Sequence, residues 1–124
     1  MIVSFIRKQD VYVAKLRGIL DHKMSAELES KMYEIVGRGT LKFILDMRHV
    51  KGILSRGVHV LVDIRNHVQQ MGGTVKLVSL QRQAQFVLDF AKVTELFDVY
   101  PDQVSAFESF GIWIKKRSRP EGPS

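Results

Sequence analysis

The sequence of 124 residues contains no cysteine. This absence excludes a disulfide framework, a thiolate metal site and a cysteine nucleophile, and it is compatible with a reducing compartment. No apolar run approaches the roughly 18 residues that span a bilayer. The first eight residues also lack the charged and hydrophobic regions of a signal peptide. We therefore expect a soluble cytoplasmic domain with no membrane span.

Motifs of enzyme chemistry are also missing. The sequence has neither the G-x-x-x-x-G-K-[ST] phosphate loop nor the G-x-G-x-x-G dinucleotide motif. Ser55 does not stand in the G-x-S-x-G frame of hydrolases, because position 53 is Ile53. Asp21 and Asp46 each follow an apolar segment, but nothing in the sequence brings the two carboxylates together. We expect no catalytic residue, no cofactor and a protein that is not an enzyme.

One spacing resembles that of metal ligands. His59, Asp63 and His67 recur every four residues and so share one face of a helix. Two interpretations are open, a transition-metal site and a solvated polar face. Because the spacing alone is a weak signal and no fourth ligand is evident, we favour the polar face and predict no metal.

The chain contains enough hydrophobic residues to form one core. Hydrophobic residues make up 45% of the sequence, and the length suits a single domain. The net charge of +6 is uneven, since residues 114–124 hold four basic residues and one Glu. We predict a domain over residues 1–113 and a basic, disordered tail over residues 114–124.

The basic tail leaves a second interpretation open. Trp113 stands beside the run Lys115–Arg119, and an aromatic next to basic residues can attach to nucleic acid or to an anionic membrane. So few charges more often only keep a chain in solution. We therefore predict no nucleic-acid partner, and deletion of residues 114–124 would test this.

Hydrophobic periodicity predicts alternating strands and helices. The predicted strands cover residues 3–8, 11–17, 41–47, 74–79 and 96–100, and the first two form a hairpin. The predicted helices cover residues 22–36, 56–71, 81–91 and 101–110, and residues 48–54 are predicted to be a loop. This order indicates an α/β domain with a mixed, mostly parallel sheet of four to five strands, an N-terminal β-hairpin and about four helices.

The inward faces of the helices are also predicted from spacing. The first helix should bury Met24, Leu28, Met32 and Ile35; the second Val58, Leu61, Ile64 or Arg65, Val68 and Met71; and the third Ala84, Val87, Leu88 and Ala91. The unbroken run Phe43-Ile44-Leu45 indicates a strand that is covered on both faces.

Ser55 lies where the predicted loop meets the second helix. Its hydroxyl could cap the helix by accepting a backbone N–H bond. Alternatively, a phosphate on Ser55 would meet free N–H groups and the positive end of the helix dipole. Arg56, Lys51 and Arg48 are close enough in sequence to pair with such a phosphate. Gly57 would keep the surface beside the serine flat.

Four segments in order resemble the STAS domain family of sulfate transporters and anti-sigma factor antagonists. Leu16-Arg-Gly18-Ile-Leu20-Asp21 resembles the family's L-x-G-x-L-D, and Phe43-Ile-Leu-Asp46-Met-Arg-His-Val50 resembles V-L-D-L-S-x-V. Ile53-Leu54-Ser55-Arg56-Gly57-Val58 is similar to I-D-S-S-G-L, and Leu96–Tyr100 with Ala106 resembles the closing strand and helix. The resemblance covers residues 3–110.

The resemblance implies a non-enzymatic regulator of transcription. Free-standing family members bind an anti-sigma factor that is a serine/threonine kinase, which phosphorylates the serine at the position of Ser55 and so switches partners. A phosphatase is then a further partner, and the protein itself a monomer or weak dimer. The implied partner-binding residues are Asp21, Leu54, Ser55, Arg56, Gly57, Val58 and His59.

This chain departs from the family pattern beside the serine. Leu54 stands in place of the family's Asp, Arg56 in place of Ser or Thr, and Gly52 in place of an apolar or aromatic residue. An apolar Leu54 suits constitutive protein binding. The alternative function is therefore a constitutive STAS scaffold, or a small subunit of a stress-signalling or lipid-transport ABC complex.

Overall fold

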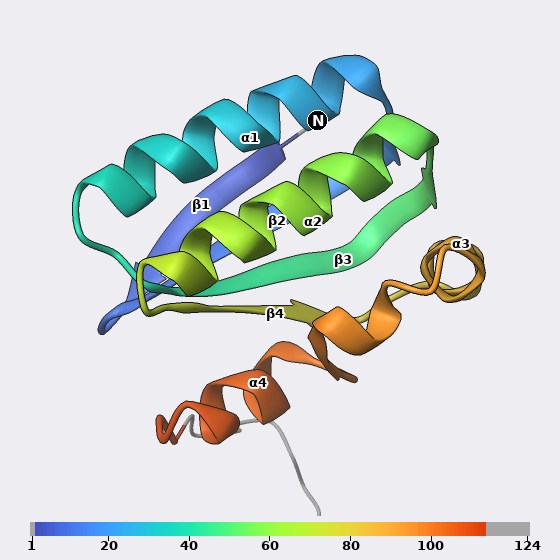
Figure 1. The fold of residues 1–124 in the computed structure, drawn as a ribbon. Coiled ribbons are helices and arrows are strands. Elements are labelled where there is room, and N and C mark those ends of the chain that lie inside the picture. The colour runs from blue at the N-terminus through green and yellow to red at the C-terminus, as the bar shows by residue number, and fades with distance from the viewer. Residues whose placement is uncertain (1, 114–124) are drawn as a thin grey trace, which may run out of the picture.

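The computed structural model describes residues 2–113 as alternating strands and helices (Figure 1). In chain order the elements are β1 (Ile2–Lys8), β2 (Val11–Leu20), α1 (His22–Gly37), β3 (Lys42–Ile53), α2 (Ser55–Gln70), β4 (Thr74–Val78), α3 (Arg82–Phe90), the 3-10 turn η1 (Thr94–Leu96), β5 (Asp98–Tyr100) and α4 (Gln103–Ser109). The predicted tail over residues 114–124 lies outside the described residues.

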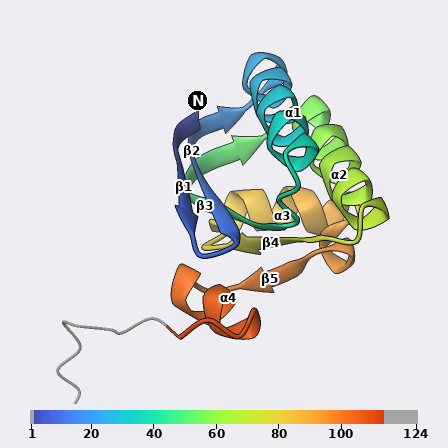
Figure 2. The same cartoon turned by 90° about the vertical axis from the view of Figure 1, so that its left-hand side faces the viewer.

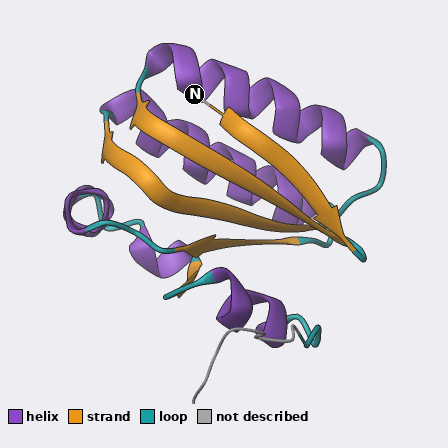
Figure 3. Cartoon of the chain, turned by 180° about the vertical axis from the view of Figure 1, so that it is seen from behind, coloured by secondary structure: helices purple, strands orange, loops and turns teal. Residues whose placement is uncertain are grey.

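The five strands form one sheet in the order β1-β2-β3-β4-β5. β1 pairs with β2 in antiparallel fashion through a tight turn at Gln9 and Asp10, and every later neighbour is parallel. Figure 3 shows the strands in front of the two long helices. The predicted α/β class, the hairpin and the mostly parallel sheet are confirmed.

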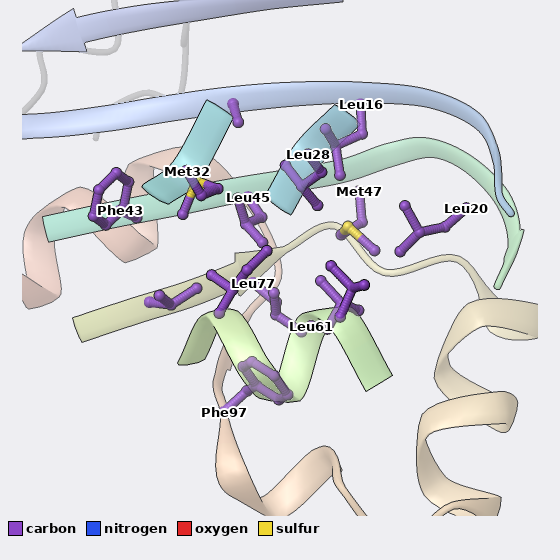
Figure 4. Close-up of a cluster of buried hydrophobic side chains, with 14 of the residues drawn as sticks. Leu16, Leu20, Leu28, Met32, Phe43, Leu45, Met47, Leu61, Leu77 and Phe97 are labelled. Atoms are coloured by element: carbon purple, nitrogen blue, oxygen red, sulfur yellow. The ribbon is translucent and has the colours of Figure 1, made fainter. Parts of the chain in front are cut away.

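The main core lies between the sheet and the pair α1 and α2, which run side by side over one face (Figures 1 and 2). Figure 4 shows how Leu28 and Met32 from α1 and Leu61 from α2 meet Leu45 of the sheet. Each of these side chains is at most 1% exposed. Burial of one such side chain contributes about 1.5–3 kcal/mol, so the core holds both helices on this face of the sheet.

A smaller core covers the opposite face of the sheet. It joins Ala106 and Phe107 of α4 to Ile44 of β3 and Val78 of β4. Ile44 points to this face while its neighbours Phe43 and Leu45 point to the main core. The predicted two-sided burial of β3 is confirmed.

Two strands are longer than the sequence predicted. β2 continues to Leu20, and β3 continues to Ile53, so the predicted loop over residues 48–54 is wrong. The register between these strands shifts twice, between Lys15 and Arg17 and between Gly18 and Ile19. Such irregularities break the alternation of apolar and polar residues on which the prediction depended.

The helix predictions were more accurate. All four predicted core positions of α1 are buried, and Ile64 rather than Arg65 faces the core in α2. Met71 was predicted to be buried but is 54% exposed, because α2 ends at Gln70 and Gly72 turns the chain with φ +88°. In α3, Ala84 and Leu88 are buried as predicted, whereas Ala91 is exposed.

Candidate functional site

The candidate site lies where β2 and β3 end together. Leu20 is paired with Ile53, and the Leu54 N–H donates to the Leu20 carbonyl at 3.1 Å. Parallel strands bring their carboxyl ends to one edge of a sheet, where sites form in α/β folds. Asp21 and Leu54, which are 33 positions apart in the sequence, are therefore neighbours in space.

Asp21 has a structural role at this edge. It is the N-cap of α1, and its Oδ1 accepts a hydrogen bond from the Met24 N–H at 3.0 Å. The residue is half-buried, so one carboxylate oxygen holds the helix while the side chain still borders the surface. An Asp at this position both starts α1 and contributes a negative charge beside Leu54.

Ser55 does not cap α2. Leu54 occupies the N-cap position with extended backbone and no side-chain cap bond, and Ser55 is the first helical residue. The capping interpretation is therefore wrong. Ser55 is exposed, which leaves its hydroxyl open to solvent at the positive end of a helix of 16 residues.

Gly57 and Val58 position the helix and offer little surface, although the edge of Val58 lines a groove described below. Both are buried. A Cβ at Gly57 would lie 2.6 Å from the Leu20 carbonyl oxygen and 2.9 Å from Ile53 Cγ2. Only glycine allows the first turn of α2 to approach the ends of β2 and β3 this closely. The expectation that Gly57 forms part of a flat accessible surface is not supported by its burial.

Arg56 and His59 are exposed on the first two turns of α2. The Arg56 Nη2 lies 3.9 Å from Glu29 Oε1, an ion pair that links α2 to α1. Of the seven predicted partner-binding residues, the accessible ones are therefore Asp21, Leu54, Ser55, Arg56 and His59.

Two aromatic residues near the site were missed from the sequence. Phe86 and Phe90 of α3 are 65% and 81% exposed, and their rings stack at 6.2 Å between centroids. With Val87 and Ala91 they face Leu54 across a groove of ≈ 430 Å³. The sequence held a signal, because the predicted inward face of this helix already excluded both phenylalanines.

Other polar residues singled out from the sequence lie away from this edge. Asp46 faces the α4 side, where it accepts bonds from Gln103 Nε2 at 2.6 Å and the Arg48 N–H at 3.0 Å. It does not meet Asp21, and its role is to join β3 to α4.

The residues His59, Asp63 and His67 do not act together as a set of ligands in the described structure. The His67 ring packs on the Tyr33 ring of α1 at 4.3 Å. Burial raises the pKa of Tyr33 above its ordinary 10.0, and the Glu29 and Asp63 carboxylates add to this shift. Within residues 2–113 no group of three or more His, Cys, Asp or Glu side chains is arranged to hold a metal ion.

None of the helices in the described part of the chain is long and apolar enough to cross a bilayer. The polar groups at the Ser55 edge are a hydroxyl, an ion-paired guanidinium, a capping carboxylate and an imidazole. Among the described residues they include no paired acid and base around the serine.

Comparison with known proteins identifies the family. The chain is 22% identical over 98 residues to the candidate anti-sigma factor antagonist BtrV of Bordetella bronchiseptica, covering 79% of this chain and 84% of BtrV. A candidate anti-sigma factor antagonist of Thermotoga maritima has the same fold, with a TM-score of 0.81 and 20% identity over 86% of this chain and 92% of that chain.

A third similar protein is SpoIIAA of Bacillus, an anti-sigma factor antagonist whose structure is known in unphosphorylated and phosphorylated forms. The unphosphorylated form gives a TM-score of 0.75 and 16% identity, covering 90% of this chain and all of that chain. The family model described as the STAS domain matches residues 3–106. This match takes in both long helices and all five strands but for the first residue of β1, and the chain belongs to the STAS domain family, as its motifs predicted.

Proposed function

We propose that this protein is a non-enzymatic anti-sigma factor antagonist of the cytoplasm that binds an anti-sigma factor kinase and is switched by phosphorylation at Ser55. The observation that carries the proposal is the exposure of Ser55 at the start of α2, beside an exposed Leu54. The binding surface consists of Asp21, Leu54, Ser55, Arg56 and His59, held in place by the buried Gly57 and Val58.

The location of Ser55 makes phosphorylation effective. A phosphate there adds about −1.5 to −2 charges and meets backbone N–H groups of the first turn of α2. The modified protein therefore keeps its fold. A partner docked over Leu54 would have to remove water from the new charge, and each 1.4 kcal/mol of that cost weakens binding about tenfold.

The relatives support this proposal at the level of family and role. BtrV and the Thermotoga protein bear the name of anti-sigma factor antagonists, and SpoIIAA has a phosphorylated form. A kinase that uses ATP, and a phosphatase that reverses the modification, complete such a switch.

A second candidate function is constitutive binding within a stress-signalling or lipid-transport ABC complex. The observation that favours it is Leu54, which is 54% exposed where the family pattern has an Asp. An exposed leucine adds apolar contact area, and it takes away a carboxylate that could orient the Ser55 hydroxyl. This alternative predicts that the state of Ser55 has little effect on binding.

One set of variants separates the two functions. Ser55→Ala and Ser55→Asp are compared for binding to the purified cognate anti-sigma kinase, with Ser30→Asp on the exposed surface of α1 as the matched control. The switch predicts that Ser55→Ala binds, Ser55→Asp does not, and Ser30→Asp binds like the unaltered protein.

Incubation with the same kinase and ATP, followed by mass spectrometry, should give a single phosphate on Ser55. Absence of that phosphate, or equal binding of the two Ser55 variants, would contradict the switch. Co-purification with a transporter ATPase subunit in place of the kinase would favour the second function.

A further inference from the structure

Exposed apolar side chains gather at the Ser55 edge of the sheet. Eight large hydrophobic residues of the described chain are exposed, and four of them come from segments that end or begin at this edge. These four are Ile19 at 50%, Leu54 at 54%, Phe86 at 65% and Phe90 at 81%. A cluster of this kind on a small domain indicates an interaction surface.

Three of these four side chains, those of Leu54, Phe86 and Phe90, line a groove between α2 and α3, and Ile19 lines a separate hollow. One wall of the groove is Ile53, Leu54 and Val58, and the other is Phe86, Val87, Phe90 and Ala91. The polar residues Ser55 and His59 also line it. Figure 1 shows α3 next to the point where β3 ends and α2 begins. A side chain from another protein can therefore contact both helices at once.

The same edge carries the positive charge of the domain. Residues 17–29, 48–59 and 81–92 hold seven Lys and Arg against two Asp and two Glu, a side-chain charge of +3. The remaining described residues hold eight Lys and Arg against eight Asp and Glu, a charge of zero. The groove is thus apolar at its centre and lies in a basic surround, on a domain that is otherwise neutral.

We propose that this groove binds an acidic protein surface that inserts apolar side chains between Leu54 and the Phe86–Phe90 pair. The proposal rests on the function proposed above and names the chemistry of the partner at the same site. Large aromatic side chains at the centre of an interface carry most of its binding energy. Complementary charge around them increases the association rate and selects the partner.

The groove also explains how one phosphate can act on so large a surface. Ser55 lines the groove, so a phosphate on it lowers the charge of the edge from +3 to about +1 and places a dianion against acidic groups of the partner. Both effects oppose the same complex. An anionic bilayer would match the charge, but its surface presents no protruding side chain to enter a groove between two helices.

The first arm of the test removes the two exposed phenylalanine rings of the groove. Binding of the purified anti-sigma kinase is measured for Phe86→Ala/Phe90→Ala and for the control Met71→Ala, another exposed hydrophobic residue (54%) at the far end of α2. We expect the phenylalanine variant to bind at least about tenfold more weakly, and the Met71 variant to bind normally. All the substituted side chains are exposed, so thermal unfolding should change little.

The second arm reverses charge. Lys51→Glu/Arg82→Glu alters two exposed residues of the basic edge, and Lys8→Glu alters an exposed residue at the opposite edge of the sheet. We expect slower association for the double variant at 50 mM salt and a much smaller difference at 500 mM salt, because salt screens exposed charges. Lys8→Glu should associate normally.

The outcomes separate this inference from the proposed function. If the kinase binds the unaltered protein and distinguishes the Ser55 variants but ignores both groove variants, the groove inference is overturned and the function stands. If the kinase does not bind the unaltered protein, both are overturned. Sedimentation with phosphatidylglycerol vesicles that is lost in Phe86→Ala/Phe90→Ala would overturn the acidic protein in favour of a membrane.

Discussion

At the scale of single residues, the chain uses glycine where two elements must touch. A Cβ at Gly57 would meet a backbone oxygen of Leu20, which cannot move without disturbing β2. A Cβ added at Gly37, the last residue of α1, would have no other atom within 4 Å. These two helical glycines therefore form a matched pair for substitution.

We predict that Gly57→Ala lowers the free energy of unfolding by about 1–3 kcal/mol, the usual cost of overpacking. Gly37→Ala should leave it unchanged or raise it by up to about 1 kcal/mol, because alanine favours helix. Urea denaturation measures both. An unaltered midpoint for Gly57→Ala would show that α2 can shift away from β2 at no cost.

Ser25 is a polar residue in the core whose hydroxyl has no visible structural role. It is fully buried in the first turn of α1, and its Oγ has no hydrogen-bond partner in residues 2–113. A buried hydroxyl without a partner costs free energy. We predict that Ser25→Ala raises the free energy of unfolding by about 0.5–1 kcal/mol, measured as a higher melting temperature. A lower melting temperature would contradict the absence of a partner.

At the scale of elements, α4 is held to the sheet by few contacts. Its apolar residues cover Ile44 and Val78, and Gln103 at its start donates to the buried Asp46 carboxylate. Hydrogen bonds to charged groups contribute about 1.5–3 kcal/mol. The short helix therefore depends on this polar contact as well as on its apolar face.

We predict that Gln103→Ala lowers the free energy of unfolding by about 1–2 kcal/mol and increases amide hydrogen exchange in α4 more than in α1. Gln85→Ala is the control, because its partner Asp89 keeps a second hydrogen bond from Thr94. Equal exchange in α4 before and after the Gln103 substitution would show that apolar packing alone holds the helix.

At the scale of the whole molecule, two exposed carboxylates connect one element to another. The Lys42 ammonium lowers the pKa of Asp10 below its ordinary 3.8, and this pair joins the hairpin turn to β3 at 3.0 Å. The Thr94 hydroxyl and the Gln85 amide lower the pKa of Asp89, which ties α3 to η1.

A carboxylate whose pKa is lower in the folded state adds stability above its unfolded pKa. That contribution is lost as the pH falls through the folded pKa. We predict that the urea midpoint decreases from about pH 5 downward, and that Lys42→Met/Thr94→Val reduces this dependence while leaving the α/β circular dichroism unchanged. A variant with the same pH dependence as the unaltered protein would show that other carboxylates dominate.

The sequence by itself determined the order of elements, the hairpin, the parallel sheet and the family. These features depend on local periodicity, on glycine stops such as Gly72 and on short motifs that contain Asp21 and Ser55, each of which spans only a few residues. The two-sided burial of Phe43-Ile44-Leu45 was predictable for the same reason.

Only the tertiary structure decided the lengths of β2 and β3, because register shifts between paired strands leave no local pattern. It also placed Ser55 inside α2 instead of at the cap, buried Gly57 against Leu20, and gathered Leu54, Phe86 and Phe90 around one groove. These outcomes depend on contacts between residues more than 30 positions apart, which no local pattern in the sequence records.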